Sequence, residues 1–251
     1  MTTGVDPCNY FPRGLQQPDH GYRFALDSLL LACFAKPKKG DNVLELGTGC
    51  GVVALGFMLH NYLLSSNLRV TGLDIQPEMV RCARENSRIL GLQYNCAFEV
   101  QDVRNVQDQS IIQAESCDLV LCNPPYRATG QGRQSPSQEK NWARFETRAG
   151  LQDFLQAAFF ILKNKAHLAM IYPAQRLDFL LQELQEQRLQ PKNLCLVHAR
   201  NNVQASLALV QARKNGGMGL EIQPPIFLYT QDKRKNIVTR QTAEFCPFAV
   251  K

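Results

Sequence analysis

Hydrophobic and polar positions along the chain follow two patterns. Short apolar runs bounded by glycine, proline or polar residues predict buried strands, and longer stretches with apolar residues every three or four positions predict helices. The predicted helices cover residues 23–35, 51–64, 77–90, 149–163 and 174–188, and the predicted strands cover residues 42–46, 69–74, 96–100, 117–122, 165–171, 193–199 and 205–212. This alternation favours an α/β fold with a parallel sheet and helices on both faces.

The last two predicted strands are separated only by the short polar stretch Arg200–Val203, so they must run antiparallel to each other. The prediction is therefore a seven-stranded Rossmann-like sheet, mostly parallel, with the last strand antiparallel. We find no repeat, low-complexity tract or linker. We expect residues 1–251 to form a single domain, with residues 1–40 as an N-terminal helical segment and residues 213–251 as a C-terminal extension.

Composition limits the class of protein. A chain of 251 residues with 45% hydrophobic residues can bury a core without disulfides or metals. It has no apolar run of membrane-spanning length and no signal-peptide pattern, so we expect a cytoplasmic protein that does not bind membranes. The nine cysteines form no C-x-x-C pair. Cys50, Cys96, Cys117, Cys122 and Cys195 lie in or beside apolar segments, so we expect buried thiols and no metal.

A glycine-rich turn joins the first predicted strand to a helix. Gly47, Gly49 and Gly51 alternate with other residues just after the strand at 42–46. Glycines let the backbone approach a ligand closely, and the start of a helix offers N–H groups to an anionic part of that ligand. The spacing is G-x-G-x-G and no Lys-Ser/Thr pair follows, which argues against a dinucleotide fingerprint and a nucleoside triphosphate loop.

Acidic residues stand at the ends of the next two predicted strands. Asp74 ends the strand at 69–74, where a doubly wound sheet commonly places a carboxylate on ribose hydroxyls. We expect Asp74 to be a ribose ligand, and it can also cap the helix that Pro77 opens. Asp102 follows the strand at 96–100, where it is either an acceptor for an adenine amine or an ordinary turn aspartate.

The tetrapeptide Asn123–Tyr126, Asn-Pro-Pro-Tyr, follows the strand at 117–122. Proline keeps the preceding residue extended, so the Asn123 amide oxygen and the Pro124 carbonyl can face one point. Two fixed acceptors suit the two hydrogens of a planar NH2 group, and Tyr126 supplies a ring on which a flat group can stack. Taken alone, the tripeptide Asn-Pro-Pro is equally consistent with an ordinary proline-rich turn.

In this order and spacing, Glu45–Gly51, Asp74, Asp102 and Asn123–Tyr126 resemble the S-adenosylmethionine-dependent amino-methyltransferases. Members of that class methylate adenine N6, cytosine N4, guanine N2 or glutamine N5. The resemblance implies catalytic roles for Asn123, Pro124 and Tyr126 in a direct, metal-free methyl transfer. It also implies an S-adenosyl-L-methionine site formed by Glu45, Gly47, Thr48, Gly49, Gly51, Asp74, Ile75, Asp102, Val103 and Asn123.

The flanking segments resemble one family more closely. Leu15–Ala32 is similar to the N-terminal segment of the small bacterial methyltransferases that modify the adenine just 3′ of the anticodon in valine tRNA, apart from Ala25, where we expect a serine. Trp142–Glu146, Gly216–Leu220 and Pro224–Tyr229 also resemble that family, whereas residues 127–141 diverge from it. The resemblance covers nearly the whole chain and implies tRNA as the partner.

Basic residues are concentrated near the predicted catalytic tetrapeptide. The net charge is only +6, but the segment after Tyr126 is rich in Arg and Lys, with further basic residues at Arg213–Lys214 and Lys233–Lys235. Such a segment suits a polyanion whose target base is flipped into the pocket, or it is a solvated loop. The predicted substrate-binding residues are Tyr22, Arg23, Arg127, Arg133, Lys140 and Arg144.

Other functions stay open at this point. A protein glutamine-N5 methyltransferase acting on a release factor needs the same two acceptors, but the enzymes of that kind carry a helical docking domain, and only about 40 residues precede Asn42 here. A ribosomal RNA guanine-N2 or adenine-N6 methyltransferase is a further alternative. A non-catalytic nucleoside-binding or RNA-binding module requires a broken site, and none of the motif residues is replaced.

Overall fold

The computed structural model describes residues 10–18, 24–61, 67–108, 112–125, 149–232 and 235–250. Its strands are β1 (Asn42–Leu46), β2 (Arg69–Asp74), β3 (Cys96–Val100), β4 (Cys117–Cys122), β5 (Leu162–Pro173), β6 (Leu189–His198), β7 (Ala205–Lys214), β8 (Glu221–Ile222) and β9 (Ile226–Phe227). Its helices are α1 (Leu26–Phe34), α2 (Val52–His60), α3 (Pro77–Ile89), α5 (Leu151–Ile161), α6 (Leu177–Glu186) and α7 (Arg240–Phe245), with short 3₁₀ turns η3 (Val103–Asn105), η4 (Ala174–Arg176) and η5 (Pro247–Val250).

All strands belong to one mixed sheet. The hydrogen-bonded order is β3-β2-β1-β4-β5-β7-β6-β8, and β9 also pairs with β6. Strands β1 to β5 run parallel, and β7 runs antiparallel to both β5 and β6, which confirms the predicted reversal between the last two long strands. The predicted count of seven is wrong, because within the described residues the sheet has nine strands. The two additional strands, β8 and β9, contain two residues each and extend the edge at β6.

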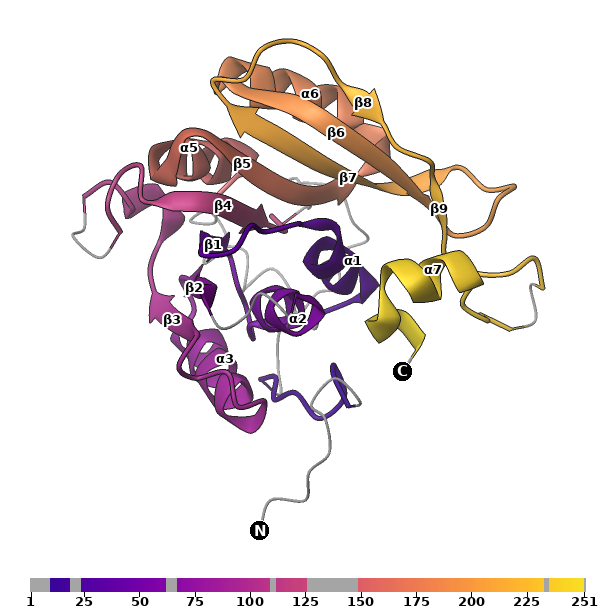
Figure 1. Cartoon of the computed structure of the whole chain (residues 1–251), viewed down its shortest axis with the longest axis horizontal. Helices are drawn as coiled ribbons and strands as arrows, with labels where there is room; N and C mark the ends of the chain where they lie inside the picture. Colours follow the sequence, from indigo (N-terminus) through magenta and orange to yellow (C-terminus); the bar gives the residue numbers. More distant parts are fainter. Residues whose placement is uncertain are drawn as a thin grey trace, which may run out of the picture.

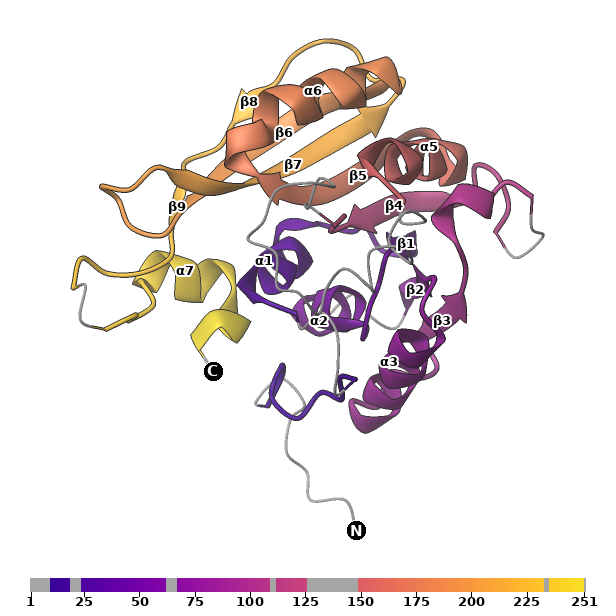
Figure 2. The ribbon, with the colours of Figure 1, turned by 180° about the vertical axis from the view of Figure 1, so that it is seen from behind.

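Helices cover both faces of the sheet, as predicted (Figure 1). Side chains alternate along each strand between two buried clusters: Val43, Leu119 and Ala169 pack with α1, α2 and α3, whereas Leu44 and Val120 pack with α5 and α6. This alternation is the two-residue period of a pleated strand. Figure 2 shows the same layers from behind, with α1 and α2 lying together on one side of the central strands. The central strands are therefore buried on both faces.

Ala25, where the family resemblance leads us to expect a serine, immediately precedes helix α1. Ala25 is the N-cap of α1 and makes no side-chain capping hydrogen bond. The helix is nevertheless buried from Asp27 to Cys33, and it packs against α2 and the sheet. Burial of its apolar side chains therefore holds α1 in place without a capping side chain.

The C-terminal extension covers the edge of the helical layer that includes α1. Thr239 caps α7 by accepting the Thr242 N–H, and Phe248 of η5 packs edge-on against Phe11 with ring centroids 4.8 Å apart. The eight cysteines of the described residues are all buried, which confirms the predicted burial of Cys50, Cys96, Cys117, Cys122 and Cys195. Among the described residues, no helix is both long and apolar enough to cross a membrane.

Candidate functional site

The carboxyl ends of the four strands β1 to β4 meet at one edge of the sheet. Leu46, at the end of β1, lies opposite Leu73 of β2 and Cys122 of β4. Asp74, the last residue of β2, lies opposite Val100 of β3. The turns that leave these strands therefore lie side by side. The residues brought together at this edge are Gly47, Thr48, Gly49, Gly51, Asp74, Ile75, Asp102, Val103, Asn123 and Pro124.

The strand order changes direction between β1 and β4. From β1 the chain proceeds outward through β2 and β3, then returns to β4 on the other side of β1. The turns that leave β1 and β4 diverge at such a switch point, and open α/β sheets bind ligands in the crevice between them. The glycine-rich turn after β1 and the Asn123 turn after β4 thus lie on the two sides of this switch point.

Asp74 fixes the glycine-rich turn to β2. Its Oδ2 accepts the Gly49 N–H at 2.8 Å, and its Oδ1 accepts the Gln76 N–H at 2.9 Å, just before α3 begins. The turn is further tied to β2 by the Thr48 N–H, which donates to the Leu73 carbonyl at 2.8 Å. Asp74 therefore lies at the sheet edge just before α3, but the prediction that it caps this helix is wrong, because the N-cap of α3 is Gln76 and no side chain caps the helix. A carboxylate can accept several hydrogen bonds, so this position suits an acceptor for a ligand hydroxyl.

The buried side chain of Glu45 holds the glycine-rich turn through hydrogen bonds. Its side chain is 1% exposed, and its Oε2 accepts hydrogen bonds from Thr48 Oγ1 at 2.6 Å and from the Ala54 N–H at 3.0 Å. Thr48 is buried as well. Burial raises the pKa of Glu45 to about 8, and the Asp74 carboxylate contributes to the rise, while the two hydrogen bonds oppose it. In this arrangement the side chains of Glu45 and Thr48 fix the turn and the start of α2.

The stability of the protein is expected to fall with rising pH because of Glu45. Its pKa of about 8 in the folded chain exceeds its ordinary value of 4.5, so the folded state holds the proton more tightly than the unfolded state. This tighter proton binding stabilises the folded state fully below the ordinary pKa of 4.5. The stabilisation is lost as the pH rises through the folded-state pKa of about 8, and the free energy of unfolding falls by up to about 1.4 kcal/mol per pH unit. Chemical denaturation of the wild type and Glu45→Gln, from about pH 5 to about pH 9, measures the difference between their free energies of unfolding. If that difference does not change with pH, the raised pKa of Glu45 is contradicted.

The turns after β2 and β3 carry an exposed apolar side chain and a paired carboxylate. Ile75 is 51% exposed, directly beside Asp74. Asp102 accepts the Arg104 N–H at 2.9 Å and Arg104 Nη2 at 2.5 Å, and these hydrogen bonds lower its pKa. Asp102 is therefore already paired, so an adenine amine would share this carboxylate with Arg104. Within the described chain, no residue accepts a hydrogen bond from the Val103 N–H.

Asn123 and Pro124 follow β4 directly and lie outside any helix or strand. Asn123 is half-buried and Pro124 is buried. The Asn123 Nδ2 donates to Ser28 Oγ of α1 at 3.1 Å. Among the described residues, none donates to the Pro124 carbonyl oxygen. This turn therefore offers a backbone acceptor beside a side-chain amide whose amino group is held by α1.

Several predicted site residues lie outside the described residues. These are Tyr126 of the tetrapeptide and the predicted substrate-binding residues Tyr22, Arg23, Arg127, Arg133, Lys140 and Arg144. Their assignments stay predictions. In the described ranges, no group of three or more His, Cys, Asp or Glu side chains is arranged to hold a metal ion.

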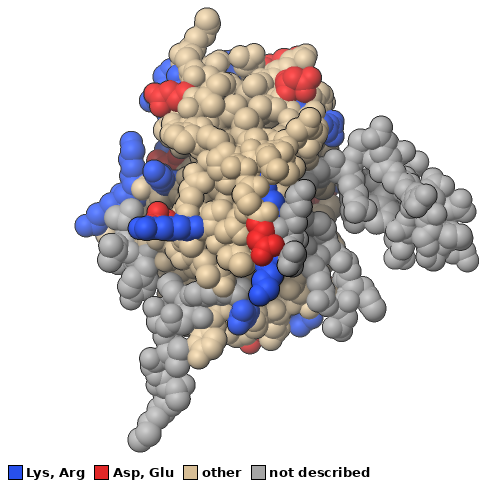
Figure 3. All heavy atoms as spheres, turned by 90° about the vertical axis from the view of Figure 1, so that its right-hand side faces the viewer, with Lys and Arg blue, Asp and Glu red and all other residues tan. Residues whose placement is uncertain are grey.

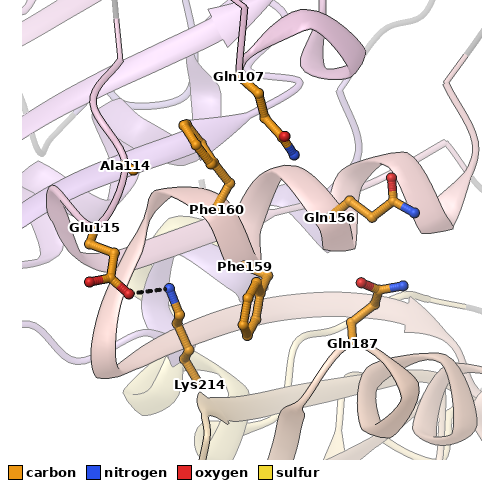
Figure 4. A pocket seen from close by; sticks show the side chains of 8 residues that line it. All are labelled: Gln107, Ala114, Glu115, Gln156, Phe159, Phe160, Gln187 and Lys214. Carbon is orange, nitrogen blue, oxygen red and sulfur yellow. Dashed lines mark hydrogen bonds and ion pairs between the residues drawn. The ribbon is translucent and has the colours of Figure 1, made fainter.

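One basic residue singled out by the sequence is not available to a polyanion. The Lys214 side chain is 4% exposed, and its Nζ donates to Glu115 at 2.9 Å and to the Leu162 carbonyl at 2.7 Å. Figure 4 shows this ion pair beside the Phe159 ring, in a cavity of about 490 Å³. The interpretation of Arg213–Lys214 as a surface cluster is therefore wrong for Lys214. The cavity adjoins Glu115, which precedes β4, so it lies at the opposite end of β4 from Asn123.

Basic side chains on the described surface are dispersed. On the face that carries α7, Lys and Arg are interspersed with Asp and Glu on an otherwise uncharged surface (Figure 3). A second cavity, of about 400 Å³, is lined by Lys36, Lys38, Lys163 and Lys165, near the amino ends of β4 and β5. Lys163 there is paired with Asp118. The described residues thus present basic groups on more than one side of the fold.

The structure adds two residues that sequence patterns did not identify. Gly72 lies in the middle of β2, where an added Cβ would come within 2.6 Å of both the Phe98 ring and Thr48 Oγ1. A glycine inside a strand signals such a close approach and could have indicated this position. Ser28 contacts Asn123 across 95 residues of sequence. No local pattern signals such a contact.

Comparison with known sequences and structures identifies a family and a shared fold. Residues 37–242 match the family model described as a methyltransferase domain. The solved structure of a predicted O-methyltransferase from Agrobacterium tumefaciens superposes with a TM-score of 0.68 at 18% identity, covering 89% of this chain and 97% of the other. The likeness to that structure concerns the fold.

Curated relatives share one name. The tRNA1(Val) (adenine(37)-N6)-methyltransferase of Porphyromonas gingivalis is 27% identical over 167 residues, which cover 65% of this chain and 63% of the relative. The match thus spans less than two thirds of that protein's length. The protein of the same name from a Flavobacteriaceae bacterium is 23% identical over 248 residues, covering 97% of this chain and 100% of the relative.

Proposed function

This chain belongs to the methyltransferase domain family, and from that premise we propose that it transfers the methyl group of S-adenosyl-L-methionine to the exocyclic N6 amine of an adenine in tRNA. The observation that carries the proposal is the position of Asn123 and Pro124. They leave β4 beside the glycine-rich turn that leaves β1, on the two sides of the switch point. A cofactor on one side and an amine on the other would thus meet in one crevice.

The residues at the edge fit this cofactor. An added Cβ on Gly49 would meet nothing within 4 Å, so the turn leaves space there for a ligand. Asp74, fixed by the N–H groups of Gly49 and Gln76, places a carboxylate acceptor at the edge where ribose hydroxyls would bind. Exposed Ile75 offers an apolar surface to an adenine ring, and the Val103 N–H offers a donor to a ring nitrogen. When bound, S-adenosylmethionine supplies an electrophilic methyl group on a positively charged sulfur.

Two glycines of the turn are expected to respond differently to a methyl group. Gly51→Ala should destabilise the fold by about 2–4 kcal/mol, because φ is +84° and the new Cβ would lie 3.1 Å from the Ala83 Cβ and 3.2 Å from the Phe98 ring. Gly49→Ala, at φ +55° with open space around it, should cost only about 1 kcal/mol. It should nevertheless weaken S-adenosylmethionine binding about tenfold, because the methyl group occupies the space left for the ligand.

Thermal denaturation and calorimetric titration of the two variants measure these effects. Equal cofactor affinity in Gly49→Ala and the wild type would show that the cofactor does not approach this turn.

The turn after β4 supplies the chemistry expected at the amine. The Asn123 amide oxygen and the Pro124 carbonyl accept the two hydrogens of the planar NH2 group. Holding both hydrogens draws the nitrogen toward tetrahedral geometry and directs its lone pair at the methyl group, so catalysis is positional and electrostatic. The positive charge on the methyl donor supplies the driving force, and the amine proton leaves to water after the transfer.

The assignment of tRNA as substrate is supported by the relatives' shared name. An unpaired anticodon loop presents its adenine at a lower cost than a duplex does, because no base pair has to be opened. Basic groups on more than one side of the described surface are compatible with a large polyanion. The nucleotide proposed is the adenine 3′ of the anticodon in valine tRNA.

A transfer assay with defined substrates tests the proposal. Purified protein and S-adenosylmethionine with a labelled methyl group are incubated with unmodified tRNA, a release-factor peptide containing Gly-Gly-Gln, and duplex DNA. The proposal predicts label in tRNA alone, recovered as N6-methyladenosine. Formation of N5-methylglutamine without transfer to tRNA would overturn it in favour of a protein methyltransferase.

A further inference from the structure

The side chain of Asn123 is held by a residue far away in the sequence. Its Nδ2 donates a hydrogen bond to Ser28 Oγ at 3.1 Å. Ser28 lies in the first turn of α1 and is 3% exposed. The accepting hydroxyl is therefore shielded from water, and α1 is itself packed into the helical layer on one face of the sheet.

The contact determines which end of the Asn123 amide faces away from α1. An amide carries a donor NH2 group and an acceptor oxygen, which diverge from the same carbon. If the Ser28 hydroxyl accepts, the amino group points to α1 and the oxygen points elsewhere. If the hydroxyl donated, the oxygen would be drawn to α1 and two N–H donors would face the opposite direction. Two N–H donors cannot hold a substrate amine, which is itself a donor of two hydrogens.

Asp27 favours the first of these arrangements. Its Oδ1 accepts the Ser28 backbone N–H at 2.7 Å and lies 3.4 Å from Ser28 Oγ. A carboxylate only accepts hydrogen bonds, so it attracts the single hydroxyl proton of Ser28. The lone pairs of Ser28 Oγ are then left for the Asn123 amino group. Both Asp27 and Ser28 are buried, so the direction of these hydrogen bonds is set within the protein.

We propose that Ser28, oriented by Asp27, is a positioning residue that sets the orientation of the Asn123 amide and directs its oxygen toward the acceptor amine. The inference rests on the proposed function for its effect on catalysis. Ser28 would then affect catalysis only through its hydrogen bond to Asn123 of the tetrapeptide.

Turnover with Ser28→Ala tests the positioning role. This variant should lower kcat on tRNA about tenfold, the scale of one lost hydrogen bond. It should leave the Kd for S-adenosylmethionine within about twofold, because the Ser28 hydroxyl contacts Asn123 and Asp27 and makes no hydrogen bond to the glycine-rich turn. Ser87→Ala is the matched control: Ser87 is also a buried helical serine, but its Oγ has no hydrogen-bond partner among the described residues. Its kcat should stay at the wild-type value. Ser28→Thr, which keeps a hydroxyl on the same carbon, should regain activity.

Two further measurements separate positioning from a general structural role. In an Asn123→Ala background, Ser28→Ala should cause no additional loss of kcat, because there is no amide left to orient. A repeated tenfold loss in that background would overturn the inference, as would equal kcat values for Ser28→Ala and Ser87→Ala.

The second measurement does not depend on activity. The side-chain amide protons of Asn123, followed by NMR, should exchange faster in Ser28→Ala than in the wild type. An unchanged exchange rate would contradict the positioning role, whereas failure of the wild type to methylate tRNA would contradict the proposed function alone.

Discussion

Asn123→Ala is expected to lower the turnover of methyl transfer by about a hundredfold or more while leaving the Kd for S-adenosylmethionine within about twofold. Asn123 leaves β4 and is held by Ser28, whereas the glycine-rich turn is held by Asp74 and Glu45. The substitution therefore removes an acceptor for the amine and leaves the contacts that fix the cofactor turn. Single-turnover kinetics with tRNA and calorimetry with the cofactor measure the two effects separately.

Asn123→Asp serves as the matched control, because it keeps an acceptor oxygen at the same position. We expect it to retain more activity than Asn123→Ala, although Ser28 would then have to donate to the carboxylate. Loss of cofactor affinity in parallel with turnover in Asn123→Ala would show that the residue maintains the structure of the crevice instead of holding the amine.

Asp74→Ala is expected to have the opposite effect, weakening S-adenosylmethionine binding by about 1–3 kcal/mol, or about 5- to 150-fold. The carboxylate accepts the N–H groups of Gly49 and Gln76 and lies at the edge where ribose hydroxyls are proposed to bind. Its removal takes away a charged acceptor and also loosens the glycine-rich turn. At saturating cofactor, kcat should change far less than the Kd.

Asp118→Ala is the control for the loss of a strand aspartate. Asp118 lies near the amino end of β4, where its carboxylate accepts the Asn42 N–H at 3.0 Å and Lys163 Nζ at 2.8 Å. Its replacement should lower the melting temperature without changing the Kd for the cofactor. An unchanged Kd in Asp74→Ala would rule out Asp74 as a ribose ligand.

The central strands were predictable because each is a short buried run between polar turns. The predicted ranges 42–46, 69–74, 96–100 and 117–122 coincide with β1 to β4. The predicted bounds of the outer strands were less accurate. β5 begins at Leu162 and β6 at Leu189, earlier than the predicted residues 165 and 193. Pairing with β7 extends β6 through the polar residues after Leu189. The hydrophobic pattern of a sequence contains no information about such hydrogen bonds between strands.

The shortest elements could not be predicted at all. β8 and β9 contain two residues each, too few to show a period, and they exist because they pair with the open edge of β6. α7 has six residues and lies in a C-terminal extension for which the sequence predicted no element. Its Thr239 cap was visible in the sequence only as one polar residue among many.

The site was predictable to the extent that it follows strand ends. Gly47, Asp74 and Asn123 each leave a buried parallel strand, and the structure brings them to one edge because the carboxyl ends of parallel strands meet there. The roles of Glu45 and Ser28 depend on contacts made after folding. Glu45 turns inward to hold Thr48, and Ser28 reaches Asn123 from a helix 95 residues away.

The most direct test of the central claim is the nucleoside content of tRNA from cells with and without this protein. Valine tRNA is purified, digested to nucleosides and analysed by mass spectrometry. The account predicts that N6-methyladenosine from the position 3′ of the anticodon disappears without the protein. It should return with the wild type and stay absent with Asn123→Ala. Unchanged N6-methyladenosine in valine tRNA from cells that lack the protein would contradict the account.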